Sequence, residues 1–182
     1  MIALNKRIKT ILMIISMLLL IPFLATLISD QVNWDVFDFL ILGTILAALA
    51  IIYEIAINKS ENTIYKVAVA IASIAMLLLF WVNGGVGIIG SEDQPANYLY
   101  GVVLLIILFG IPISKFKADK MAQTMFIAAG AQMLVPVVAY LIWPPPLTSW
   151  APGVVGVYLM TAFFAMLFLV SGLLFRRART TD

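Results

Sequence analysis

Every lysine and arginine of this chain lies in one of four clusters, and long apolar runs separate the clusters. The clusters consist of Lys6, Arg7 and Lys9; Lys59 and Lys66; Lys115, Lys117 and Lys120; and Arg176, Arg177 and Arg179. Only 11% of the 182 residues are charged and 64% are hydrophobic, whereas a soluble domain carries about 25% charged residues. A surface this apolar is unfavourable in water, so we expect the chain to lie in a lipid bilayer.

The apolar runs predict six membrane-spanning helices, because each run is close to the ~20 residues that a helix needs to cross a bilayer. The predicted spans cover residues 10–28, 36–57, 64–82, 94–113, 121–143 and 154–175. Lipid offers no partner to free backbone groups, and no run alternates like a barrel strand. We therefore expect an all-α integral membrane protein, a six-transmembrane-helix bundle that forms a single transmembrane domain over 1–182.

Charge predicts the orientation of this bundle. With six spans, all four basic clusters fall on the same side of the membrane, and an excess of Lys and Arg marks the cytoplasmic side. We therefore expect the protein in the inner membrane of a cell, with both termini in the cytoplasm. The opposite side carries the acids Asp30, Asp35, Asp38, Glu92 and Asp93, which would form an outward acidic rim.

The composition excludes several kinds of chemistry. The chain has no Cys and no His, so it lacks disulfides, Cys/His zinc sites, His-ligated haem and the commonest general base. No motif groups the remaining carboxylates, tyrosines and lysines at a catalytic spacing. We expect no enzyme activity, no cofactor and no nucleic-acid partner, and we expect the lipid bilayer and another membrane protein or a second copy of this chain as partners.

The stretch VNGGVGIIGSEDQPANYLY, residues 82–100, interrupts the apolar pattern with four glycines within seven positions. Ser91 and Gln94 have the spacing of a capping box, which predicts that the fourth helix begins there. Glu92 and Asp93 would then lie in the first helical turn, where the helix dipole favours acidic side chains. In this interpretation the stretch is a helix stop followed by a helix cap.

The same stretch has an alternative interpretation as an outward site for a cation, a polar ligand or a partner protein. Hard cations bind carboxylate and amide oxygens, and such oxygens are concentrated here. The candidate residues are Asn83, Glu92, Asp93 and Asn97, with Asp35 and Asp38 from the preceding loop on the same side. Asp35 and Asp38 are also expected to act as acids at the start of a helix.

Gln132 and Glu54 form the candidate intramembrane polar site. Pro136 lacks the amide hydrogen that would bond the Gln132 carbonyl, so a free carbonyl and a primary amide lie at mid-span. We expect a neighbouring helix to satisfy them, through Ser73 or Thr44 for example. The alternative is a small polar substrate or a file of water molecules.

Glu54 lies about one turn from the cytoplasmic end of its span. We expect it to reach the interface or to pair with Lys59 or Lys66. Because ionisable residues within membrane spans are often functional, a role in proton or cation movement is the alternative.

Three segments carry a resemblance: WVNGGVGIIGSEDQPANYLYG at 81–101, AIIYE at 50–54 and FIAAGAQMLVP at 126–136. Together they resemble an uncharacterised family of small polytopic bacterial inner-membrane proteins. The resemblance implies a bacterial inner-membrane protein. It brings no activity, ligand or functional residue.

Two functions remain open. The first is a non-enzymatic membrane subunit or scaffold with an outward acidic rim, which agrees with the short loops and the few polar residues. The alternative is a small transporter or channel for a cation or a small polar solute. The glycine break, Glu54 and Gln132 favour transport, whereas the lack of any charge at mid-membrane argues against it.

Overall fold

A computed structural model of the protein describes residues 2–28, 34–146 and 148–179, with side chains from residue 7 onward. Within these ranges the chain is all helical and has no strand. The helices are α1 (Ile2–Ile28), α2 (Val36–Ile57), α3 (Thr63–Gly85), the short 3₁₀ helix η1 (Pro95–Asn97), α4 (Tyr98–Ser114), α5 (Ala118–Ile142) and α6 (Val154–Ala178).

Six of the described helices are long and apolar enough to cross a membrane. They coincide with the six predicted spans, so the all-α class and a helix of spanning length at each predicted span are confirmed. Two starts differ most from the prediction: α1 begins at Ile2 rather than at residue 10, and α4 begins at Tyr98 rather than at residue 94. Asp30, which the sequence assigns to the acidic rim, lies outside the described residues.

The chain divides into two compact units, residues 1–54 and 55–182, which are described separately. In unit 1, Phe39 of α2 packs edge-on against Trp34, with ring centroids 5.4 Å apart, and against Phe23 of α1 at 6.3 Å. These aromatic contacts join α1 to α2 near the loop between them.

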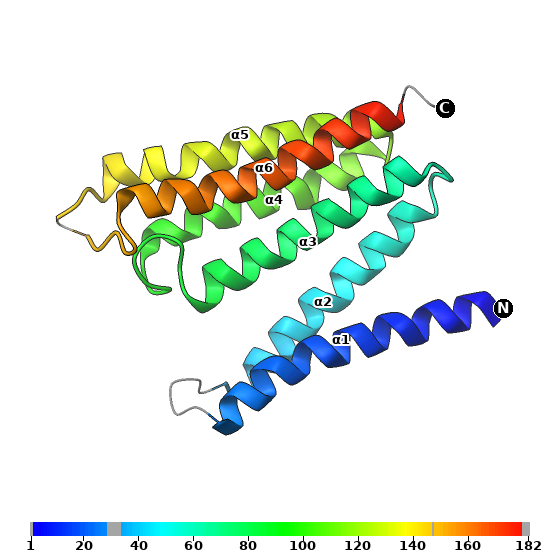
Figure 1. The fold of residues 1–182 in the computed structure, drawn as a ribbon, viewed down its shortest axis with the longest axis horizontal. Coiled ribbons are helices and arrows are strands. Elements are labelled where there is room, and N and C mark those ends of the chain that lie inside the picture. The colour runs from blue at the N-terminus through cyan, green and yellow to red at the C-terminus, as the bar shows by residue number, and fades with distance from the viewer. Residues whose placement is uncertain (1, 29–33, 147, 180–182) are drawn as a thin grey trace. The chain divides into compact units, whose positions relative to one another are not determined.

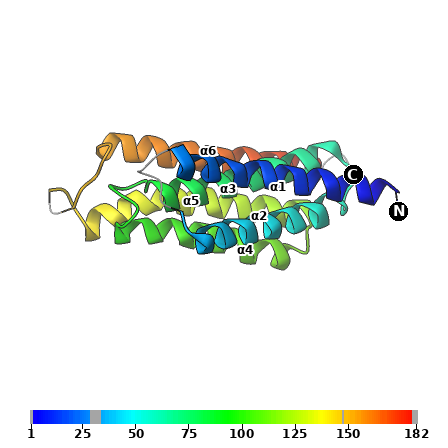
Figure 2. The same ribbon diagram turned by 90° about the horizontal axis from the view of Figure 1, so that it is seen from below.

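Unit 2 contains the four helices α3 to α6, which pack as an up-and-down bundle joined by short loops (Figures 1 and 2). Helix α6 packs between α3 and α5, and α5 also packs along α4. Glycines allow close approach: a Cβ atom on Gly172 of α6 would lie 2.6 Å from Cε1 of Phe126 on α5. The interior is lined by large apolar side chains that include Leu79, Ile107, Met125, Phe164 and Phe168.

Hydrogen bonds gather the basic segments of unit 2 at one end of the bundle. The Tyr65 hydroxyl donates to the carbonyl of Phe116 at 2.8 Å, and Nδ2 of Asn62 donates to the carbonyl of Ala178 at 3.3 Å. The segments that carry the second, third and fourth basic clusters therefore meet, and we call this the basic end. The opposite end, formed by residues 83–97, 143–146 and 148–153, is called the loop end.

Candidate functional site

The glycine-rich stretch is a folded loop organised by one side chain, Asn97, which is 2% exposed. Its Oδ1 accepts hydrogen bonds from the backbone amides of Ile88 (3.1 Å) and Ile89 (2.9 Å). Its Nδ2 donates to the carbonyls of Ile89 (3.0 Å) and Ser91 (2.6 Å). Because a primary amide has two donors and one oxygen with two lone pairs, the Asn97 side chain is fully used within the loop.

Two glycines give this loop its path. Gly87 and Gly90 have φ angles of 77° and 73°, in the left-handed region where other residues are strained. The resulting turns point Ile88 and Ile89 inward, where they are 2% and 0% exposed. The Gly90 amide also donates to the carbonyl of Ala151 at 3.1 Å. The loop therefore closes the loop end with two apolar side chains and is tied to the loop at 143–153.

The capping box predicted at Ser91 and Gln94 is wrong. Residues 91–94 form a turn in which the Gln94 amide donates to the Ser91 carbonyl at 3.1 Å. Helical backbone begins only at Pro95, because the proline ring disfavours the helical conformation for the preceding residue, Gln94. Asn97 holds the same Ser91 carbonyl. Glu92 and Asp93 consequently precede the helix and are not in its first turn.

The structure brings together two of the four residues proposed for a cation site in this stretch. Nδ2 of Asn83 donates to the backbone carbonyl of Asn97 at 3.1 Å, and Oδ1 of Asn83 is buried without a hydrogen-bond partner. Glu92 and Asp93 are exposed on the surface of the same loop. Across the described ranges, no group of three or more Asp, Glu, His or Cys side chains is placed to hold a metal ion.

Asp35 and Asp38 cap the start of α2. Oδ1 of Asp35 accepts from the amides of Phe37 (2.7 Å) and Asp38 (3.1 Å). Oδ2 of Asp38 accepts from the Asp35 amide at 2.9 Å. This reciprocal arrangement is a capping box. The prediction that both are acids of the first helical turn is confirmed for Asp38, whereas Asp35 precedes the helix.

Glu54 forms an ion pair within unit 1. Its Oε2 lies 3.9 Å from Nη1 of Arg7. The predicted partners are engaged elsewhere: Lys66 pairs with Glu61 at 3.0 Å, and Nζ of Lys59 lies 5.9 Å from the centroid of the Phe116 ring. Glu54 therefore pairs with a basic residue as expected, but the partner belongs to α1 instead of the segment that follows α2.

Gln132 is completely buried in the interior of unit 2. Neither its Nε2 nor its Oε1 has a hydrogen-bond partner among the described residues. Pro136, one turn later, lies inside α5. The hydroxyl of Thr44, one of the predicted partners, donates to the carbonyl of Leu40 in its own helix at 2.7 Å. The expectation that a neighbouring helix satisfies the Gln132 amide is wrong for this structure.

The sequence did not predict a hydroxyl pair that joins α4 to α6. Tyr100 and Thr161 are both fully buried, and their hydroxyl oxygens are 2.6 Å apart. A second bond from α6 runs from the Ser171 hydroxyl to the carbonyl of Ala68 on α3, at 2.9 Å. The only sequence signal for these contacts is a hydroxyl residue within an apolar run, which does not identify its partner.

The buried polar side chains of the described residues are all neutral. They are Asn97, Ser114, Thr124, Gln132, Thr161 and Ser171. The interior of the bundle therefore offers hydrogen-bonding groups but no buried charge among the residues described.

Comparison of the chain with protein-family models, with curated proteins and with solved structures gave no match.

Proposed function

We propose that this chain is a non-enzymatic subunit or scaffold of a bacterial inner membrane, and that its loop end presents an acidic surface to a partner protein. The observation that carries the proposal is the construction of the loop around Asn97. Its amide makes four hydrogen bonds to the loop backbone, while Glu92 and Asp93 remain exposed on that rigid frame. A rigid surface is suited to recognition because little ordering entropy is lost on binding.

The distribution of charge supports an orientation with the loop end outside. Three of the four basic clusters belong to segments that meet at the basic end of unit 2. Since Lys and Arg are enriched on the cytoplasmic side of membrane proteins, the basic end would face the cytoplasm. Both termini would then be cytoplasmic, and Glu92 and Asp93 would face outward. The resemblance of residues 81–101 to bacterial inner-membrane proteins supports a place in a bacterial inner membrane.

The packing of unit 2 favours a scaffold over a cation transporter. Ile88 and Ile89 fill the loop end of the bundle, and the buried polar groups described are neutral. Intramembrane cation pathways are usually lined by ionisable residues. The alternative function, transport of a small neutral solute, is favoured by one observation, the unpartnered amide of Gln132. If transport is the function, Gln132→Leu should abolish it; if the chain is a scaffold, the same change should leave its partner bound.

The surface at Glu92 and Asp93 fits a partner with a basic segment outside the membrane. Opposite charges steer association and set specificity, and both effects weaken as salt increases. The test is native mass spectrometry of the full chain extracted gently from its own membrane, for the wild type and for the Glu92→Lys/Asp93→Lys variant. We expect a second polypeptide with the wild type and its loss with the variant.

The matched control is Glu61→Lys, which reverses an exposed acid at the basic end. We expect this variant to retain the partner. A wild-type chain that appears alone or only with copies of itself would overturn the proposed docking role, and so would a partner that survives the double charge reversal.

A further inference from the structure

We propose that Gln132 anchors an internal hydration site, in which at least one water molecule is bound between the helices of unit 2. The starting observation is that its side chain is 0% exposed and that both of its polar atoms lack a hydrogen-bond partner. Buried polar groups in folded proteins are nearly always hydrogen-bonded, to protein or to ordered water. This inference does not depend on the proposed docking function.

Pro136 removes the usual hydrogen-bond donor of a further group, the backbone carbonyl of Gln132. A proline has no amide hydrogen, so the backbone carbonyl of Gln132 lacks its usual donor one turn later in the helix. Gln132 therefore offers two N–H donors and one carbonyl oxygen on its side chain, and a backbone carbonyl without its usual donor. A ligand that satisfies them must be able both to donate and to accept hydrogen bonds.

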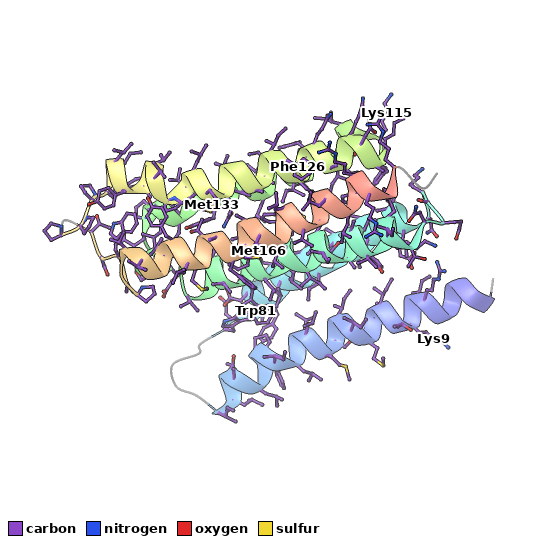
Figure 3. All side chains as sticks on the ribbon, turned by 45° about the horizontal axis from the view of Figure 1, so that its top comes forward. Lys9, Trp81, Lys115, Phe126, Met133 and Met166 are labelled. Atoms are coloured by element: carbon purple, nitrogen blue, oxygen red, sulfur yellow. The ribbon has the colours of Figure 1, made fainter. Side chains whose placement is uncertain are left out.

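A glycine contact establishes which part of α6 lies beside Gln132. A Cβ atom on Gly172 would lie 3.2 Å from Cβ of Met125, so these two residues face each other. Gln132 follows Met125 by two helical turns, and antiparallel packing therefore places it level with Ala165. Met133 follows Gln132 on α5, and Met166 follows Ala165 on α6. Figure 3 labels both near the middle of these neighbouring helices.

Apolar side chains occupy this level on the neighbouring helices. Because the Ser171 hydroxyl bonds the Ala68 carbonyl, the part of α3 level with Ala165 lies about six residues after Ala68. The buried residues of α3 next to that level are Ala72, Ala75 and Met76. None of these side chains has an N–H or O–H donor, so they leave the Gln132 amide to a small polar occupant.

The hydroxyl pair of Tyr100 and Thr161 lies on the loop-end side of Gln132. Thr161 is four residues from Ala165, about 6 Å along α6 at 1.5 Å per residue. Side chains tilt toward the N-terminus of their own helix, and α5 and α6 run in opposite directions. The Gln132 and Thr161 side chains therefore lean apart, which explains why no direct bond forms between them.

The backbone carbonyl of Gln132 points in the opposite direction to its side chain, because helical carbonyls face the C-terminal end of a helix. For α5 this is the loop end. The carbonyl is therefore directed toward the level of the Tyr100–Thr161 pair. A water molecule bound to this carbonyl would be suitably placed to bridge to the hydroxyls. Water is the smallest neutral molecule with both donors and acceptors, and buried waters typically make about three such bonds.

The test is a water-contact NMR experiment on the full chain in lipid nanodiscs, with ¹⁵N-labelled glutamine. The Gln132 side-chain signal is identified by its loss in Gln132→Met. Selective labelling of the Gln132–Met133 pair identifies it in the unmodified chain, because no other glutamine precedes a methionine. We expect a cross-peak between the Gln132 NH₂ group and long-lived water, and slower exchange into D₂O than for Gln123, which is exposed.

The variant Thr161→Val shows whether the cross-peak comes from bound water or from the exchangeable proton of the Thr161 hydroxyl. We expect the water cross-peak to persist in this variant. Three results would overturn the hydration site: no cross-peak to water, a cross-peak that disappears with the Thr161 hydroxyl, or cross-peaks to carbon-bound protons of a co-purified solute. The last result would assign the same polar site to a small neutral organic ligand.

Discussion

The Asn97 side chain and the Ile89 backbone are paired face to face, as neighbouring residues are in a β-ladder. Oδ1 of Asn97 accepts from the Ile89 amide at 2.9 Å, and Nδ2 donates to the Ile89 carbonyl at 3.0 Å. The loop thus gains the backbone pairing that it would otherwise lack in a buried position. One side chain therefore determines both where the loop enters the bundle and where α4 begins.

Replacing Asn97 should destabilise the protein more than any change at the exposed acids beside it. Asn97→Ala leaves the amides of Ile88 and Ile89 buried without a partner, and each unsatisfied group costs about 1–3 kcal/mol. We expect a loss of about 2–4 kcal/mol in the free energy of unfolding, measured by titration with denaturing detergent in mixed micelles. Glu92→Ala is the control, and it should change stability by less than about 0.5 kcal/mol. Equal effects of the two changes would contradict the role assigned to Asn97.

Gly90 and Gly101 make a matched pair for testing the loop path. Gly90 has a φ angle of 73°, and a Cβ atom there would lie 2.6 Å from the carbonyl oxygen of Ser149. Gly90→Ala should therefore destabilise the protein by about 2 kcal/mol or more, from strain and steric clash together. In α4, Gly101 has no atom within 4 Å of an added Cβ, so Gly101→Ala should be neutral or stabilising by up to about 1 kcal/mol. Thermal unfolding measures the change in stability of each variant. A Gly90→Ala variant as stable as Gly101→Ala would contradict the assigned loop path.

The helices could be predicted from the sequence because length, apolarity and charge act locally along the chain. α2 spans the predicted residues 36–57, and α6 begins at the predicted Val154. The start of α4 could not be predicted in this way. A Ser91–Gln94 spacing is a local signal, but the bonds from Asn97 to residues 88–91 compete with it, and these bonds form only once the loop has folded back into the bundle.

The candidate intramembrane site shows the same limit. The sequence places an amide beside a proline at mid-span, and the structure confirms that Gln132 is buried. Whether the amide has a partner depends on the register between helices, which the sequence does not reveal. That register follows from contacts such as Gly172 with Met125, so the missing partner of Gln132 and the Tyr100–Thr161 pair emerge only in three dimensions.

The register between α5 and α6 can itself be tested at Gly172. An added methyl group would lie 2.6 Å from Cε1 of Phe126, so Gly172→Ala should cost about 1–3 kcal/mol through overpacking. Adding Phe126→Leu should recover part of this loss, because it removes the ring atoms that clash. Gly130 has no atom within 4 Å of an added Cβ, and Gly130→Ala serves as the control. Unfolding in mixed micelles measures the wild type, the two single variants, the double variant and the control. Strictly additive effects of Gly172→Ala and Phe126→Leu would argue against the contact.

The hydroxyl pair in the core should behave as a coupled unit. Tyr100→Phe leaves the Thr161 hydroxyl buried without its partner, and Thr161→Val does the same to Tyr100. Each single change should therefore destabilise the bundle, whereas the double change removes both polar groups and should cost less than the sum. Hydrogen bonds between membrane helices contribute about 0.6 kcal/mol on average and up to about 1.7 kcal/mol. We expect a coupling energy in that range from a double-mutant cycle, measured by unfolding in mixed micelles. A coupling energy of zero would mean that the two hydroxyls do not bond in the membrane.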